Sequence, residues 1–118
     1  IGKFINAYKN NKTITIDGDG HQKRDFISVD DSVDAVLLLL ELANSGTYNI
    51  GTGKSISILD LADLFDCPTL FGPNRRGPEY NTCADISKLK ALGFTPSTDV
   101  MNWILEHKKT NFEELKCH

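Results

Sequence analysis

The chain has 118 residues, of which 40% are hydrophobic and 25% are charged, and its formal net charge at pH 7 is -3. Such values are typical of one globular domain with one core. Because there is no excess of basic residues, binding to nucleic acid is not expected. The longest apolar stretch, 35–40, is much shorter than the roughly 20 residues that cross a bilayer, so no membrane association is expected either.

The cysteines and the start of the chain bear on its location and completeness. Cys67, Cys83 and Cys117 form an odd, widely spaced set, and no secretion signal is present, which favours a reducing cytoplasm. The chain opens inside an amphipathic pattern without an initiator Met. This opening predicts that the chain is a piece of a larger protein.

The first elements predict an α/β fold. Helical spacing of apolar residues predicts a helix over 1–9, and the β-branched run 13–16 predicts a strand. A turn follows at 18–20, and residues 25–29 alternate between apolar and polar. Together these segments predict a β-hairpin.

The next segment predicts a long helix. Asp30 or Asp31 is expected to cap its amino end, and the helix should run to about residue 43. Its apolar residues are dense from 33 to 42, which predicts burial on more than one side.

Strand and helix then alternate again. A strand is predicted over 47–50 and a tight turn over 51–53. Ser57 and Asp60 have the spacing of a capping box, so Ser57 is expected to cap a helix over 58–65.

The last third predicts a loop, a short strand and two helices. The loop spans 68–78 and the strand 80–83. Asp85 or Ser87 should begin the first helix, which ends at Gly93. Ser97 or Thr98 should begin the second, an amphipathic helix that runs through Leu115.

Several catalytic patterns almost occur, and their spacing argues against them. Gly53-Lys54-Ser55 resembles the end of a phosphate-binding loop, but Tyr48 stands where the first glycine is required. The pairs 18–20 and 51–53 lack the third glycine of a dinucleotide fingerprint.

Two further patterns have simpler explanations. Tyr8 and Lys12 have the Tyr-x-x-x-Lys spacing of short-chain dehydrogenases, but Lys12 lies beyond the predicted end of the helix. The segment 17–20, Asp-Gly-Asp-Gly, lacks the remaining ligands of a calcium loop and is expected to be a turn.

A series of motifs resembles one protein family over nearly the whole chain. Residues 18–31 read Gly-Asp-Gly-His-Gln-Lys-Arg-Asp-Phe-Ile-Ser-Val-Asp-Asp, and residues 48–53 read Tyr-Asn-Ile-Gly-Thr-Gly. Ser-Ile-Leu-Asp-Leu-Ala follows at 57–62 and Ala-Asp-Ile-Ser-Lys at 84–88. In order and spacing these segments resemble the extended short-chain dehydrogenases, which are NAD-dependent epimerases and dehydratases of sugar nucleotides.

The resemblance implies a fold and a function. The chain would be the carboxyl-terminal, substrate-binding part of such an enzyme: one domain over 1–118, with a small mixed sheet or hairpin and helices. The absent Rossmann half would hold NAD(P) and the catalytic Tyr and Lys, so this chain would bind no cofactor and be inactive alone. The complete protein would act on a nucleoside-diphosphate sugar, and relatives often form homodimers. The alternative is a standalone nucleotide-sugar-binding module without catalytic activity.

The resemblance also implies site residues. Arg24 and Arg75 would contact the substrate diphosphate, and the strand backbone at Ile16 and Asp17 would lie along the base. Two guanidinium groups from separate segments suit a pyrophosphate, because each can form charge-assisted, bidentate hydrogen bonds. Many relatives carry Tyr or Phe where this chain has Asp17, so the sequence leaves the base open.

Two alternatives concern the arginines. Arg24 could instead form a structural ion pair with Asp25 or Asp31. Spacing from the Ala-Asp pair at 84–85 favours Arg75 over Arg76 as the second phosphate contact. The identity of the sugar and the type of reaction stay open, because the absent half would decide them.

Overall fold

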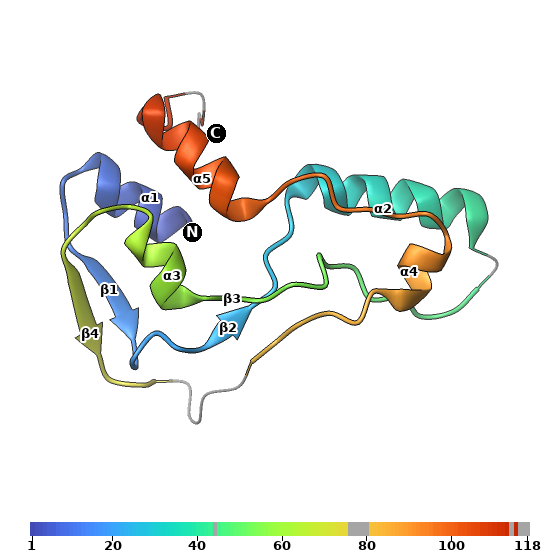
Figure 1. Cartoon of the computed structure of the whole chain (residues 1–118), viewed down its shortest axis with the longest axis horizontal. Helices are drawn as coiled ribbons and strands as arrows, with labels where there is room; N and C mark the ends of the chain where they lie inside the picture. The colour runs from blue at the N-terminus through green and yellow to red at the C-terminus, as the bar shows by residue number, and fades with distance from the viewer. Residues whose placement is uncertain (44, 76–80, 114, 116–118) are drawn as a thin grey trace. The chain divides into compact units, whose positions relative to one another are not determined.

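The computed structural model describes residues 1–43, 45–75, 81–113 and 115 (Figure 1). Contacts along the chain divide it into two compact units. Unit 1 consists of Ile1–Gln22, Ser57–Tyr80 and Met101–His118, and unit 2 consists of Lys23–Ile56 and Asn81–Val100. The chain is a mixed α/β protein with small sheets.

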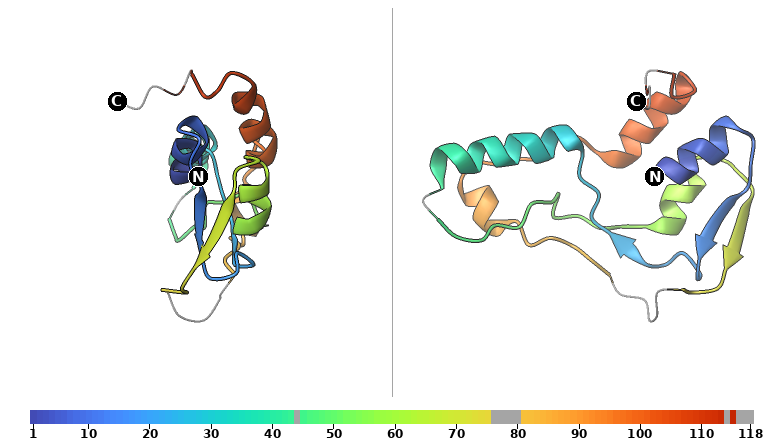
Figure 2. Two further views of the ribbon diagram at one scale, coloured as in Figure 1. Left: turned by 90° about the vertical axis from the view of Figure 1, so that its left-hand side faces the viewer. Right: turned by 180° about the vertical axis from the view of Figure 1, so that it is seen from behind.

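Unit 1 is built on two parallel strands. Its elements are α1 (Gly2–Lys9), β1 (Ile14–Asp17), α3 (Ile58–Asp63), β4 (Thr69–Gly72) and nearly all of α5 (Val100–Lys109). In β1 and β4, which lie side by side, Ile14 is opposite Thr69 and Asp17 is opposite Gly72 (Figure 2).

The core of unit 1 is aliphatic under the strands and aromatic between the helices. Ile14 and Ile16 are buried while the alternate β1 residues are exposed, as the period of a strand requires. Phe65 and Phe112 are fully buried and stack with ring centroids 5.9 Å apart, and Tyr8 packs edge-on against both rings.

Unit 2 is centred on one long helix. It contains β2 (Lys23–Arg24), α2 (Val29–Leu42) and α4 (Ser87–Ala91), and β2 pairs with β3 (Ile56–Ser57). Four buried residues form its core: Ala35, Ile86, Leu89 and Phe94.

The predicted hairpin is wrong. The partner of β1 is β4, in parallel, and residues 25–28 form no strand. The sequence analysis did not predict β4, because its short β-prone run Thr69–Gly72 lies inside a segment whose prolines and glycines predicted a loop. Residues 47–50 and 81–83 also form no strand, and Tyr80, the first residue of the second predicted strand, lies outside the described residues.

The helix starts were predicted with mixed success. Ser57 caps α3 as expected, since its Oγ accepts from the Asp60 N–H at 3.0 Å. The cap of α2 is Ser28 rather than Asp30 or Asp31, because the Ser28 Oγ accepts from the Asp31 N–H at 3.1 Å. The Asp31 side chain is thereby free for a longer-range role.

Asp31 joins α2 to the segment that precedes α5. Its side chain is 1% exposed and accepts hydrogen bonds from Ser97 N–H at 3.0 Å, Ser97 Oγ at 2.7 Å and Thr98 N–H at 3.0 Å. Burial by itself raises the pKa of this carboxyl, but the bonds from Ser97 and Thr98 outweigh burial and lower the pKa from 3.8 to about 2.

This lowered pKa predicts acid sensitivity. A carboxyl with a lower pKa in the folded state stabilises the fold above its unfolded pKa, and the stabilisation is lost as the pH falls through the folded pKa. The free energy of unfolding should therefore decrease between about pH 5 and pH 2, by on the order of 2 kcal/mol for Asp31. Urea unfolding at a series of pH values, followed by circular dichroism, measures this decrease.

Asp31→Asn should lower the free energy of unfolding at pH 7 by about 2 kcal/mol and flatten its pH dependence. Asp30→Asn is the matched control, since Asp30 is the exposed neighbour in the same helical turn. The control should change stability by less than about 1 kcal/mol. Equal losses in the two variants would contradict the role given to Asp31.

Candidate functional site

The carboxyl ends of β1 and β4 meet at one edge of the parallel pair. Asp17 lies opposite Gly72 there, and the Gly18 N–H donates to the Gly72 carbonyl at 3.1 Å, so pairing continues past the strands. Arg75 is exposed and follows Gly72 by three residues. Ligands of α/β proteins commonly bind outside the carboxyl ends of parallel strands. This edge is the candidate site.

A glycine turn shapes this edge. Gly18 and Gly20 have φ values of +74° and +83°, which L-residues with a Cβ rarely adopt. The Asn74 side chain lies over the turn, since a Cβ at Gly18 would be 3.6 Å from the Asn74 Cβ. The segment after β4, which carries Arg75, is thus packed on the turn after β1.

Asp19, the acidic residue of the turn, accepts a hydrogen bond from within the turn segment. The Asp19 Oδ1 accepts from the His21 N–H at 2.9 Å and lies 3.3 Å from the His21 Nδ1. Within the described part of the chain, no three His, Cys, Asp or Glu side chains are grouped to hold a metal ion. The segment is a turn, as the sequence predicted.

Ile16 and Asp17 differ in what they present. The Ile16 side chain is 2% exposed, and its backbone N–H and C=O groups, like those of Ile14 and Gly18, are directed toward β4. Since Ile14 and Gly18 direct their amides toward β4, the backbone groups of Thr15 and Asp17 face the opposite edge of β1. No other strand of the described residues pairs with that edge.

Gln22 braces the end of β1. Its Nε2 donates to the Asp17 carbonyl at 3.0 Å. Its Oε1 is buried and has no hydrogen-bond partner among the described residues. Gln22 thus holds the last β1 residue before the turn.

The structure brings three of the four predicted site residues into unit 1. Ile16, Asp17 and Arg75 lie on β1 or just after β4, whereas Arg24 lies on β2 in unit 2. Arg24 is half-buried, and its Nη1 donates to the Lys23 carbonyl at 2.9 Å.

Asp25, next to Arg24, connects its own segment to two distant segments of unit 2. It accepts from the backbone N–H groups of Thr52 at 2.9 Å, Gly53 at 3.0 Å and Ala84 at 3.2 Å, and from the Thr52 hydroxyl. Burial raises the pKa of the Asp25 carboxyl, but the Thr52 hydroxyl and these backbone bonds lower it overall. No local pattern signals this role, because the partners are 27 to 59 residues away.

The Gly51–Gly53 turn does not fit the phosphates of a dinucleotide or of a phosphate-binding loop. Such loops aim free N–H groups at the phosphate. Here the Thr52 and Gly53 N–H groups donate to Asp25, and the Lys54 N–H donates to the Thr52 Oγ1 at 3.2 Å. A Cβ at Gly51 would lie 2.5 Å from the Ala84 Cβ, so the turn is packed against its own chain.

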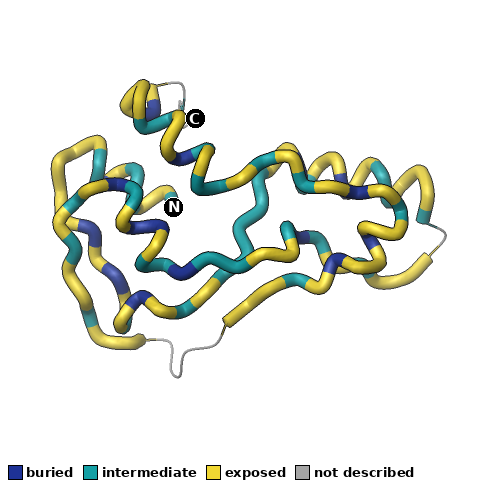
Figure 3. The backbone as a smooth tube through the Cα atoms, in the orientation of Figure 1, coloured by how far each residue is buried: buried dark blue, intermediate teal, exposed yellow. Residues whose placement is uncertain are grey.

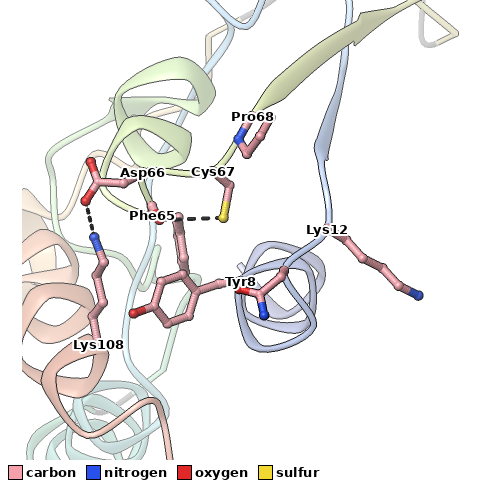
Figure 4. A pocket seen from close by; sticks show the side chains of 8 residues that line it. Tyr8, Lys12, Phe65, Asp66, Cys67, Pro68 and Lys108 are labelled. Atoms are coloured by element: carbon pink, nitrogen blue, oxygen red, sulfur yellow. Dashed lines mark hydrogen bonds and ion pairs between the residues drawn. The ribbon is translucent and has the colours of Figure 1, made fainter.

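Tyr8 and Lys12 do not form a catalytic pair. Helix α1 ends at Lys9, and Figure 4 shows Lys12 directed away from the Tyr8 ring. The cation next to this ring is instead Lys108, whose Nζ lies 5.6 Å from the ring centroid and also binds the Asp66 carboxylate. The spacing in sequence could not reveal Lys108, which comes from α5.

The amino-terminal part of the chain matches a known family. Residues 1–51 match the model of the NAD dependent epimerase/dehydratase family. A candidate UDP-glucose 4-epimerase of Methanocaldococcus jannaschii is 34% identical over 123 residues, covering 93% of this chain and 40% of that protein.

Solved structures agree with this match. A UDP-N-acetylglucosamine 4-epimerase of Methanobrevibacter ruminantium M1, in complex with UDP-N-acetylmuramic acid, is 32% identical with a TM-score of 0.81, over 96% of this chain and 39% of that one. A UDP-glucuronic acid 4-epimerase of Bacillus cereus, in complex with UDP-glucuronic acid and NAD, is 28% identical with a TM-score of 0.81, over 97% and 39%.

By sequence and by fold, the chain matches the NAD-dependent epimerase/dehydratase family. It spans about two fifths of the length of the relatives described above. No helix in the described ranges has the length and apolar character needed to cross a membrane.

Because the 51–53 turn is closely packed, one added methyl group at Gly51 should lower the stability of the fold. Gly51→Ala places a Cβ against Ala84 and 2.7 Å from the Asp25 Oδ2, so the free energy of unfolding should decrease by about 1–3 kcal/mol. Gly2→Ala is the control, because a Cβ there meets nothing within 4 Å, and it should leave stability unchanged or slightly higher. Urea unfolding of both variants measures the difference, and a neutral Gly51→Ala would disprove the packing.

Proposed function

We propose that this chain is the carboxyl-terminal, nucleotide-sugar-binding part of an NAD-dependent epimerase or dehydratase. Arg24 and Arg75 contact the substrate diphosphate, and the backbone at Ile16 and Asp17 lies along the base. The NAD is held by the Rossmann part of the polypeptide, which this chain does not include. The sugar chemistry also belongs to that part.

The observation that carries the proposal is the convergence at the carboxyl edge of β1 and β4. This edge combines a turn that contains two glycines with positive φ and an exposed arginine, Arg75, three residues after β4. The side chain of Asn74 fixes the arginine-bearing segment on the turn. An exposed guanidinium at this edge is suited to an anionic ligand.

The open edge of β1 supports the placement of the base. The Thr15 and Asp17 backbone groups point away from β4, and backbone N–H and C=O groups can pair with the polar edge of a base. The Gln22 side chain already engages the Asp17 carbonyl. The Asp17 N–H and the Thr15 carbonyl are therefore the groups that we assign to the base.

Unit 2 contributes Arg24, while the Thr52 and Gly53 amides of its 51–53 turn are already bonded to Asp25. Because the amides of the Gly51–Gly53 turn are engaged by Asp25, this turn leaves recognition of the diphosphate to side chains. The relatives solved with UDP-sugars extend over 96% and 97% of this chain, so Arg24 and Arg75 both lie in the part that resembles them.

Calorimetric titration of the chain with UDP-glucose, UDP-glucuronic acid and a dTDP-sugar tests the proposal. Arg24→Gln and Arg75→Gln should each weaken binding by about 10- to 100-fold, since hydrogen bonds to charged groups contribute about 1.5–3 kcal/mol. Arg76→Gln is the matched control and should have little effect. Unchanged affinity in both the Arg24 and Arg75 variants would overturn the proposal.

A second titration with uridine separates phosphate contacts from base contacts. Uridine has no phosphate, so the two arginine variants should bind it as the original chain does. A loss of uridine affinity as large as the loss for UDP-sugars would show that the substitutions act on the fold, and the arginines would then have no direct phosphate role.

A turnover assay tests separately whether this chain binds substrate without catalysing the reaction. The chain incubated with NAD and UDP-glucose should give no epimerised or dehydrated product, because general acid–base chemistry and the cofactor belong to the other part of the polypeptide. Chromatography of the sugar nucleotides measures this. Clear conversion would contradict the assignment of chemistry to the absent part.

A further inference from the structure

The backbone at Lys23, one residue before Arg24, is held by a distant segment of unit 2. The Lys23 N–H donates to the Asn81 Oδ1 at 3.0 Å, and the Lys23 carbonyl accepts from the Thr82 N–H at 3.1 Å. Asn81 lies 58 residues further along the chain. A single distant segment therefore engages both backbone groups of Lys23, which fixes the conformation of this residue.

The same carbonyl supports the guanidinium of Arg24. The Arg24 Nη1 donates to the Lys23 carbonyl at 2.9 Å. A carbonyl oxygen has two lone pairs, so it can accept from Thr82 and from Arg24 together. The direction of the Lys23 carbonyl thus determines where the guanidinium is held, and the bond from the Lys23 N–H to Asn81 helps to set that direction.

Strand pairing alone does not fix this part of the chain. Strand β2 has two residues, and so has its partner β3. A pairing of two short strands is marginally stable by itself. The segment 81–84 adds contacts on both sides of Arg24, since Asn81 and Thr82 bind Lys23 and the Ala84 N–H donates to Asp25 at 3.2 Å.

The exposure of Asn81 indicates what its bond contributes. Residues 81–83 are exposed, as the tube in Figure 3 shows, and Lys23 is exposed too. Without Asn81 the Lys23 N–H would bond to water, so the bond to Asn81 adds little to the stability of the fold. It supplies instead a fixed direction of the backbone next to Arg24, which an exchanging water molecule does not supply.

We propose that Asn81 is a positioning residue for Arg24, an inference that rests on the proposed contact between Arg24 and the substrate diphosphate. Asn81 holds the Lys23 backbone before the ligand arrives, so the guanidinium is already directed when the diphosphate binds. Ordering a long side chain on binding costs affinity, and a preorganised support removes part of this cost. Asn81 acts through the backbone and not by contact with the ligand.

A double-mutant cycle on ligand affinity tests this role. Calorimetric titration with UDP-glucose compares the original chain, Asn81→Ala, Arg24→Gln and the variant with both substitutions. Asn81→Ala should weaken binding by about three- to tenfold, the factor that one hydrogen bond commonly contributes. In the Arg24→Gln background the same substitution should have no further effect, because the guanidinium that Asn81 positions is gone.

Uridine and a second asparagine provide the controls. Uridine has no phosphate, so Asn81→Ala should bind it as the original chain does. Asn49→Ala is the matched variant, since Asn49 is another exposed asparagine of unit 2, and its Nδ2 donates to the Asp85 carbonyl at 3.1 Å. Asn49→Ala should leave the affinity for UDP-glucose unchanged.

Hydrogen exchange followed by NMR tests the bond itself. The Lys23 amide should exchange faster in Asn81→Ala than in the original chain, because its protected partner has been replaced by water. The midpoint of urea unfolding should change little, since the substituted residue is exposed. Equal exchange rates in the two proteins would show that Asn81 does not hold this amide, and would overturn the inference.

The affinities also separate this inference from the proposed function. Three results would overturn the positioning role: unchanged affinity of Asn81→Ala for UDP-glucose, an equal loss for uridine, or a loss of the same size in the Arg24→Gln background. If Arg24→Gln weakens binding and Asn81→Ala does not, only the positioning role is wrong. If Arg24→Gln itself leaves the affinity unchanged, the proposed diphosphate contact of Arg24 is wrong, and the positioning role fails with it.

Discussion

Unit 2 depends on carboxylates that accept hydrogen bonds from backbone far away in the sequence. Asp25 accepts hydrogen bonds from backbone N–H groups of the 51–53 turn and of Ala84. Asp31 accepts them from the backbone N–H groups of Ser97 and Thr98. Residues 25–28 and 81–86 form no strand, so a ladder does not join these segments. Buried ionised groups need such partners, and the hydrogen bonds that lower their pKa values also hold the unit together.

This arrangement constrains where an anion could bind. The N–H groups that donate to Asp25 cannot also donate to a phosphate. The 51–53 turn, which resembles two nucleotide-binding motifs in sequence, is therefore a packing element of the fold. The turn after β1 is different, because the segment after β4 covers one side of it and carries an exposed arginine. Two glycine turns of similar composition therefore have different uses, and their hydrogen-bond partners distinguish them.

The exposed apolar residues of α2 and the edge of the parallel pair differ in their chemistry. The α2 residues have acidic neighbours, whereas the edge combines backbone groups with a guanidinium. An apolar surface suits a permanent protein contact, and a polar edge with a cation suits a small anionic ligand that exchanges with water.

Local chemistry in the sequence predicted the helices, the Ser57 cap, a strand close to β1 and the glycine turn, because periodicity and capping act over a few residues. The predicted last helix was too long, since α5 ends at Lys109 and not at Leu115. The motifs of residues 18–31 and 48–53 likewise indicated the family. Only the tertiary structure decided that β1 pairs with β4 and that Asp25 and Asp31 bind distant backbone. Strand partners and long-range acceptors depend on contacts between residues 27 or more apart, and no local pattern records these. The exposure of Val33, Leu37 and Leu40 on α2 was also decided at this level, since a sequence shows that a helix has two apolar sides but not which side its own chain covers.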